Sequence, residues 1–456
     1  MASIFSQLMT SQQVGIGKVV VGKAPDPDKN KTGITVTVTV FFDGTLNNRY
    51  NTAARLSRLS GADRYGGAGT SYANFYSNVS ILETLNRKKV PTRKEISIYI
   101  EGEGTDYIET DPANPKLTDD SLKGYAMGSG DTGIPAKVTK GMNKIRDRIN
   151  DKKFYKTEKE YIKELKIDVF GFSRGAAAAR HFVHRKAELT TWAKQKETAQ
   201  VTIKFVGLFD TVSSYHDGLS LSPNFKDDVR ELGLRIGSNA QKVVHLTAGD
   251  EYRVNFASTS IASSIAAGVG YECVLPGAHS DVGGGYAEME TEERKFISPE
   301  ELERLVREGW YRRGPDPAPN QIGTHVENYE SLSEPTITAR WTVGRRTIQY
   351  HYQLIPLAIM RALALKSGLE LDFEDFASEK TRPFEVPAEL ATTKATMLKL
   401  VLDNDRPHRQ VITLALNEQT RMLRNRYLHR SAQVGDAANG PQYDKKLLPA
   451  RDSIAG

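Results

Sequence analysis

The feature that most constrains this chain is a glycine–serine–glycine turn set between an apolar run and an alanine run. Residues 167–170 are apolar except for Asp168, the turn reads Gly171-Phe-Ser-Arg-Gly175, and four alanines follow. The apolar run predicts a buried strand, and the alanines predict a helix. In that context Gly-x-Ser-x-Gly is a nucleophile elbow, whose tight turn exposes a serine hydroxyl at the end of a sheet. Ser173 is therefore the candidate nucleophile; the alternative is a glycine-rich turn whose serine only caps the helix.

Apolar, β-branched runs alternate with helical patterns over the first two thirds of the chain. The expected strands are 34–42, 96–100, 167–170, 201–209, 243–247 and 272–276. Helical patterns cover residues 72–85 and 138–150, whereas Asp106 to Gly133 is polar and glycine-rich. The alternation predicts an α/β fold with a mostly parallel sheet covered by helices on both faces. We expect the glycine-rich stretch to be a long loop over the site.

The chain divides into three parts by pattern. We expect a lead-in over residues 1–30, an α/β-hydrolase-like catalytic core over 31–295, and a mainly helical region over 296–456 that packs on the core. The helices expected in the last part begin near Ser298 and cover 354–365, 388–404 and 409–428. The tail from about residue 433 is polar and contains Gly435, Gly440 and Pro441, so we expect it to be loose.

Composition excludes several classes of protein. The net charge of +6 comes from 62 basic and 56 acidic residues, with no basic run interleaved with aromatics that would favour nucleic acid. A single cysteine, Cys273, excludes an intramolecular disulfide. Neither a secretory signal nor an uninterrupted apolar run of membrane-spanning length is present in this sequence. We therefore expect synthesis in the cytoplasm and, if the protein is exported, a route that needs no cleaved signal.

A serine nucleophile needs a general base and an acid that orients the base. His279 follows the last predicted core strand and precedes three glycines, so its loop can bring the imidazole over the serine. Asp210 closes a very apolar strand, where an unpaired carboxylate would be costly. Asp250 also follows a strand and stays an alternative, whereas Asp281 lies only two residues from His279 and better suits a turn cap. The order serine, aspartate, histidine is that of α/β-hydrolases.

The loop after the first strand is the expected partner of the elbow in binding an oxyanion. It reads Phe42-Asp43-Gly44, and we expect the amides of Arg174, Asp43 and Gly44 to be the donors. Asp-Gly-Thr also occurs in haloacid-dehalogenase phosphatases, but Phe41 stands where their nucleophilic aspartate would be. Phenylalanine cannot form an aspartyl phosphate, so that class is excluded. The serine mechanism requires no metal or cofactor.

Five motifs together carry a family resemblance. They are Phe42-Asp-Gly-Thr-Leu-Asn47, Glu101-Gly-Glu-Gly-Thr105, Gly171-Phe-Ser-Arg-Gly-Ala176, Leu208-Phe-Asp-Thr-Val212 and Pro276-Gly-Ala-His-Ser-Asp-Val-Gly-Gly-Gly-Tyr286. The set resembles the first family of type VI secretion lipase effectors, an α/β-hydrolase domain formerly of unknown function. The resemblance spans roughly residues 34–290. It departs at Phe209, where the family often has tryptophan, and it does not extend past residue 295.

The resemblance implies a phospholipase A-type antibacterial effector with Ser173, Asp210 and His279 as its triad. It implies type VI secretion into the periplasm of a target cell, with membrane phospholipids, a secretion spike protein and a cognate immunity protein as partners. Two alternatives stay open: a soluble esterase or acyl hydrolase with a small substrate, and a non-catalytic hydrolase-fold binding module. The 106–133 loop and the apolar 354–365 segment are candidate lids or membrane-docking surfaces, against a passive loop and a core helix.

Overall fold

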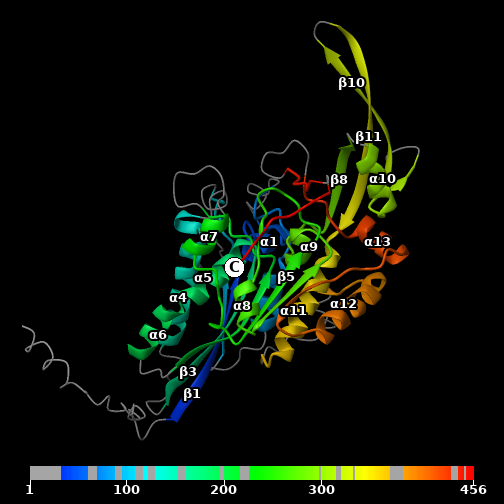
Figure 1. Cartoon of the computed structure of the whole chain (residues 1–456). Coiled ribbons are helices and arrows are strands. Elements are labelled where there is room, and N and C mark those ends of the chain that lie inside the picture. The colour runs from blue at the N-terminus through cyan, green and yellow to red at the C-terminus, as the bar shows by residue number, and fades with distance from the viewer. Residues whose placement is uncertain are drawn as a thin grey trace, which may run out of the picture.

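Figure 1 shows the computed structural model of the chain. It contains a seven-stranded parallel sheet in the order β12-β7-β5-β4-β3-β1-β2. Its strands are β1 Thr32–Phe42, β2 Glu95–Ile100, β3 Glu160–Phe172, β4 Gln200–Phe209, β5 Lys242–Ala248, β7 Gly270–Leu275 and β12 His408–Val411. The structure describes residues 32–59, 69–87, 95–107, 117–121, 129–151, 160–195, 200–215, 225–296, 299–314, 320–331, 334–369, 384–432, 440–445 and 448–456. The lead-in expected at 1–30 lies outside these residues.

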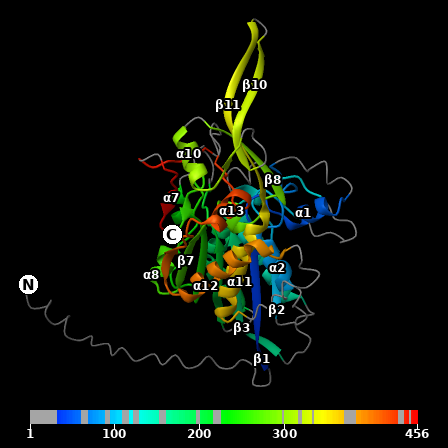
Figure 2. The same ribbon diagram turned by 90° about the vertical axis from the view of Figure 1, so that its right-hand side faces the viewer.

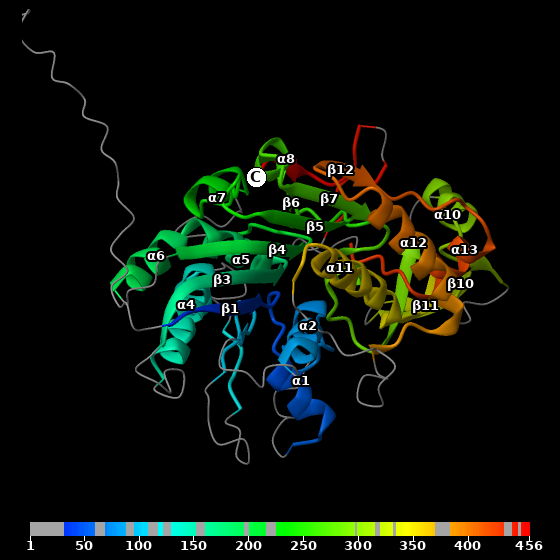
Figure 3. The same cartoon turned by 90° about the horizontal axis from the view of Figure 1, so that it is seen from below.

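Helices cover both faces of this sheet (Figure 3). One face carries α4 Ile134–Asn150, α5 Arg174–His184 and α6 Lys186–Gln195, and the other carries α2 Asn78–Arg87, α11 Leu354–Lys366 and α12 Ala391–Asp403. Alternate β1 side chains enter two separate cores: Val38 and Val40 pack with α4 and α5, and Phe41 packs with α2 and α11. This period of two is what a strand buried on both faces requires. The expected α/β fold class is confirmed.

Shorter elements connect these layers. They are α1 Arg49–Leu56, η2 Gly130–Thr132, α7 Phe225–Glu231, β6 Ser258–Thr259, α8 Ala262–Ala266, α9 His279–Gly283, α10 Pro299–Arg307, η3 Tyr350–Gln353, η5 Ala388–Leu390, α13 Glu418–Arg426 and β13 Ser453–Ile454. No helix within the described ranges has both the length and the apolar content needed to cross a bilayer.

A second sheet occupies part of the region expected to be mainly helical. It consists of β8 Met289–Phe296, β9 Arg312–Arg313, β10 Gln321–Ser331 and β11 Glu334–Gln349, in the order β8-β11-β10-β9. Strands β10 and β11 form a long hairpin that projects from the body of the molecule (Figures 1 and 2). The sequence of β11 is rich in threonine, isoleucine, valine and tryptophan, which favour strands over helices.

The end of the chain returns to the core. The helix expected at 409–428 is helical only over 418–426, and residues 408–411 pair in parallel with β7 as the edge strand of the main sheet. The expectation of a loose tail is wrong for residues 448–456, because β13 pairs with β6. The amide of Ser258 also donates to the carbonyl of Asp452 at 2.8 Å.

The helix expected from residue 72 begins only at Asn78. The segment before it is held in turns, since the amide of Phe75 donates to the carbonyl of Gly285 and the Ser77 hydroxyl donates to Asp43. Of the expected 106–133 loop, residues 108–116 and 122–128 lie outside the described part of the chain.

Candidate active site

Ser173 lies on the turn between β3 and α5, with backbone angles φ 58° and ψ −125°. A positive φ is costly for a residue with a Cβ, and such strain is concentrated at functional sites. The Ser173 side chain forms no capping hydrogen bond to α5, which speaks against the alternative of a helix-capping serine. A Cβ at Gly175 would lie 2.1 Å from the carbonyl oxygen of Asp43, so this glycine permits the elbow to contact the loop after β1.

His279 begins α9, directly after the turn that follows β7. Its Nε2 lies 2.7 Å from the Ser173 Oγ. The ring of Phe172 packs at a centroid distance of 4.7 Å, and the ring of Phe256 packs edge-on at 5.1 Å. Burial between these rings lowers the pKa of His279 below its usual value, against the opposing effect of Asp210. The imidazole is therefore neutral near pH 7, as a general base must be.

Asp210 directly follows β4, and its Oδ2 lies 2.5 Å from the Nδ1 of His279. The backbone φ of Asp210 is +40°, a second strained position beside the site. Its carboxylate is fully buried and accepts the amide of Ala248 at 3.0 Å. Burial raises the pKa of Asp210, but the charge of Arg451 and the hydrogen bond to His279 outweigh burial and hold this pKa well below its usual range. Asp210 thus stays ionised.

The other two acid candidates serve turns. Asp250 accepts the amide of Gly277 at 2.6 Å and donates its own amide to the Gly277 carbonyl at 2.9 Å. Asp281 accepts the amide of Ala278 at 2.9 Å, and its second oxygen contacts the Nδ1 of His429 at 2.7 Å. Both carboxylates therefore brace the loop that carries His279, and it is Asp210 that contacts the imidazole.

The loop after β1 differs from the expectation of open amide donors. The amide of Asp43 donates to the carbonyl of Ile100 at 2.9 Å, and the amide of Gly44 donates to the Asp43 Oδ1 at 2.8 Å. The physical reason is that the short Asp43 side chain folds back on its own loop. There Ser77 and Tyr99 also donate to it. Burial raises the pKa of Asp43 to about 6.

Arg174 links the elbow to this loop through its side chain. Its Nε donates to the Thr45 Oγ1 at 2.7 Å. Glu103 is buried nearby; burial raises its pKa to about 7, although the charge of Arg174 opposes that rise. The three loops that follow β1, β2 and β3 thus meet at one edge of the sheet. Parallel strands place their carboxyl ends there, which is where open α/β sheets hold their sites.

Two charged residues at the site were missed by sequence reasoning. Arg451 pairs with both oxygens of Asp210, at 2.7 Å and 2.9 Å. Glu251 accepts the amide of His279 at 3.2 Å and is paired with Arg253 at 2.9 Å. No local pattern marks Arg451, which lies in a polar tail. Glu251 could have been found from its position after a strand beside Asp250.

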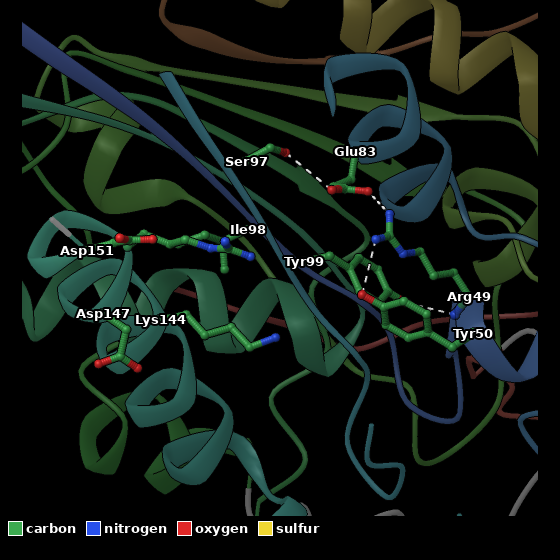
Figure 4. A pocket seen from close by; sticks show the side chains of 10 residues that line it. Arg49, Tyr50, Glu83, Ser97, Ile98, Tyr99, Lys144, Asp147 and Asp151 are labelled. Carbon is green, nitrogen blue, oxygen red and sulfur yellow. Dashed lines mark hydrogen bonds and ion pairs between the residues drawn. The ribbon is translucent and has the colours of Figure 1, made fainter. Parts of the chain in front are cut away.

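A polar pocket of about 350 Å³ lies beyond the β1 loop and contains side chains of both charges (Figure 4). Arg49 forms an ion pair with Glu83 there, and its guanidinium lies 4.6 Å from the ring centre of Tyr99. Tyr99 in turn donates to Asp43 at 2.5 Å. Tyr99, which lines this pocket, therefore links it to the loop that carries Asp43.

Residues 182–308 match the family described as type VI secretion phospholipase effector Tle1-like, catalytic domain. The chain is similar to the Tle1-like phospholipase effectors. This match confirms the resemblance expected from the motifs and supports a hydrolase. The matched stretch contains Asp210 and His279, and Ser173 lies before its first residue.

One solved structure that aligns with this chain supports the fold. A structure of the Tle1 effector bound to the VgrG spike from the type VI secretion system has a TM-score of 0.61 at 22% identity, and the alignment covers 96% of this chain and 99% of that one. An uncharacterized protein from Pseudomonas aeruginosa aligns with a TM-score of 0.41 at 18% identity, over 85% of this chain and 52% of that one. No curated protein matches the chain.

Proposed function

We propose that this chain is a serine-dependent lipid ester hydrolase, a phospholipase A-type effector that attacks membrane phospholipids of target cells. The observation that carries the proposal is the hydrogen-bonded series Ser173–His279–Asp210, with 2.7 Å and 2.5 Å separations, on a strained strand–helix elbow. Nucleophile, base and orienting acid within hydrogen-bond reach are the arrangement that activates a serine.

The chemistry follows from these contacts. The His279 Nε2 takes the proton of Ser173 as the Oγ attacks the ester carbonyl, while Asp210 holds the other ring nitrogen and stabilises the imidazolium. The glycerol-side alcohol leaves with the proton from His279, and an acyl-enzyme is left. Water then attacks this ester and gives a proton to His279. The bond between the acyl carbon and the Ser173 Oγ breaks, the fatty acid is released, and His279 returns the proton to the Ser173 Oγ.

The oxyanion of each tetrahedral intermediate needs donors beside Ser173. The amide of Arg174, the first residue of α5, is the donor best placed by the elbow. The Gly44 amide can join it only by releasing the Asp43 carboxylate, to which it is bonded at 2.8 Å. We therefore assign Arg174 the main role and the Asp43–Gly44 loop a conditional one.

Delivery and partners rest on the family resemblance. The matched family description names type VI secretion, and the similar Tle1 structure is bound to the VgrG spike. We propose that this chain is loaded on a secretion spike, reaches the periplasm of a target cell and is neutralised in its own cell by an immunity protein.

The test of the serine chemistry is labelling by a fluorophosphonate probe, which reacts only with an activated serine. We expect labelling of the purified chain on the peptide that contains Ser173, and none of Ser173→Ala. A substrate panel of long-chain phospholipids and short-chain soluble esters then separates the two hydrolase classes. An unlabelled wild-type chain that is folded by circular dichroism would favour the binding module and overturn the proposal.

A further inference from the structure

The end of the chain reaches the centre of the proposed site. Arg451 lies in the segment 448–456, and 241 positions separate it from Asp210 in the sequence. Its Nη1 and Nη2 contact the two carboxylate oxygens of Asp210 at 2.7 Å and 2.9 Å, a fork-to-fork geometry that only arginine supplies.

The remaining donors of Arg451 bind the backbone around the site. Nε donates to the carbonyl of Phe256 at 2.6 Å, and Nη1 also reaches the carbonyl of Ala248 at 3.2 Å. Phe256 packs edge-on against the His279 ring, and the Ala248 amide is itself bonded to Asp210. One guanidinium therefore touches the acid, the segment behind the acid and the segment that supports the base.

Backbone pairing holds this segment in place on both sides of Arg451. The amide of Ala450 donates to the Gln442 carbonyl at 3.0 Å, and β13 pairs with β6 after it. Further along, Ser260 donates its amide to Ile454, and Ser263 donates to Gly456, each at 2.9 Å. The Arg451 side chain is only 10% exposed, so water screens its charge weakly.

We propose that Arg451 is a positioning residue for the Ser173 site, which orients Asp210 toward His279 and compensates its buried negative charge. The inference rests on the proposed function, since Asp210 matters to catalysis only if Ser173 is a nucleophile. Hydrolases of this kind need an acid that is fixed and ionised, and here a segment distant in sequence supplies both conditions.

Removal of the Arg451 charge changes the titration of Asp210 and His279 in a definite direction. The positive charge of Arg451 balances the negative charge of ionised Asp210 when His279 is neutral. Without Arg451, ionised Asp210 and neutral His279 carry a buried net negative charge. The pair then binds a proton more readily, so the acid limb of kcat/KM moves to higher pH. The other charges acting on His279 are those of Arg253, which lowers its pKa, and Glu251, which raises it, and these two residues pair with each other at 2.9 Å.

Two variants separate charge from geometry. Arg451→Gln removes the charge, and we expect the acid limb of kcat/KM to rise by about one pH unit or more, the usual effect of a charge this close. Arg451→Lys keeps the charge but loses the fork, so we expect the limb to return at least halfway while kcat stays below that of the wild type. Arg346→Gln is the matched control, because Arg346 is a buried arginine paired with Glu292 away from Ser173. It should lower stability and leave the limb unmoved.

The titration of His279 gives a readout that does not depend on turnover. We expect the histidine C–H resonance that disappears in His279→Asn to titrate at higher pH in Arg451→Gln than in the wild type. That shift in a chain with no hydrolytic activity would refute the proposed function and leave the placement of Arg451 standing. If Arg451→Gln fails to fold, Arg451→Lys carries the test through its expected loss of kcat, and a kcat equal to that of the wild type would overturn the proposal. Coinciding limbs and titrations for the wild type, Gln and Lys chains, or equal shifts in Gln and Lys, would overturn the proposal.

Discussion

Asp210 and Asp250 both follow strands at the same sheet edge, but only one of them contacts the imidazole. Asp210 lies 2.5 Å from the His279 Nδ1, and Asp250 is bonded to the turn at Gly277. Asp210→Asn should leave His279 in the wrong tautomer and lower kcat about 10⁴-fold. Asp250→Asn keeps an acceptor for the Gly277 amide and should cost less than about tenfold. The reverse ranking in steady-state kinetics would make Asp250 the acid.

The protonation of His279 sets the acid side of the activity profile. Burial lowers the pKa of His279, and only the neutral ring accepts the serine proton. Values of kcat/KM should therefore be full near pH 7 and fall with a midpoint below about 6.5, the unperturbed value for histidine. A pH–rate profile with a soluble ester checks this, and a midpoint above 7 would contradict the described surroundings of His279.

The residues of the site differ in how far neighbouring residues in the sequence predict their roles. Ser173 and Asp210 directly follow strands, and His279 follows the turn after one, so position after a strand together with the chain order serine, aspartate, histidine makes them candidates. The closed state of the Gly44 amide depends on the side-chain rotamer of Asp43, which sequence pattern does not report. Arg451 acts through a contact with a residue 241 positions away.

At the scale of elements, the elbow depends on a close approach between α5 and the loop after β1. A Cβ at Gly175 would lie 2.1 Å from the Asp43 carbonyl and 2.5 Å from that of Phe42, both backbone atoms. Gly175→Ala should therefore destabilise the fold by about 1–3 kcal/mol, the usual cost of overpacking, and lower activity through displacement of the elbow. Ser173→Ala, which only removes a hydroxyl, is the control for stability in a denaturant titration. Equal stability of Gly175→Ala and wild type would contradict this packing.

The link between α4 and the loop after β2 is a buried ion pair. Lys137 donates to Glu101 at 2.6 Å and to the Thr105 carbonyl at 2.6 Å, while the more exposed Lys140 also contacts Glu101. Lys137→Met should lower the free energy of unfolding by roughly 3 kcal/mol, since the buried Glu101 carboxylate then has an apolar side chain beside it in place of the Lys137 cation. Lys140→Met is the matched control, with a loss of about 1 kcal/mol or less.

This pair also predicts a pH window. Burial raises the pKa of Glu101, but the charges of Lys137 and Lys140 outweigh burial and lower it to about 2. A carboxyl whose folded pKa lies below its unfolded value of about 4.5 stabilises the fold above that pH and loses this contribution as pH falls toward 2. The stability difference between wild type and Lys137→Met should therefore shrink between about pH 5 and pH 2. A constant difference in urea titrations over that range would contradict the ion pair.

The elements that sequence predicted well are long and periodic. The strands from β1 to β7 in the main sheet and the helices α4 and α11 lie close to their expected positions, except that β3 begins seven residues before the expected start at 167. Strand β12 has only four residues, too few for a period to show, and its assignment depends on pairing with β7. The β10–β11 hairpin is absent from the sequence prediction. Helical patterns after residue 295 led to a helical prediction for the whole region, although the β-branched composition of β11 favours a strand.

At the scale of the whole molecule, the mild positive charge bears on membrane binding. The net charge is +6. If the chain works at a bilayer, anionic vesicles should bind it and be hydrolysed more readily at low salt, because screening weakens the attraction. Fatty-acid release from anionic and zwitterionic vesicles, compared between about 0.05 and 0.5 M salt, checks this. Equal rates for both vesicle types at every salt concentration would contradict a role for the net charge in membrane binding.

The central claim is that Ser173 is the nucleophile of a lipid hydrolase. The most direct measurement is fatty-acid release from mixed phospholipid vesicles by wild type and by Ser173→Ala, with a short-chain soluble ester assayed in parallel. We expect release from vesicles by the wild type and a loss of about 10⁴-fold or more in Ser173→Ala with an unchanged fold. Activity of Ser173→Ala within about tenfold of wild type would contradict the assignment of the nucleophile. Turnover of the ester with no release from vesicles at any salt concentration would contradict the assignment of the lipid substrate.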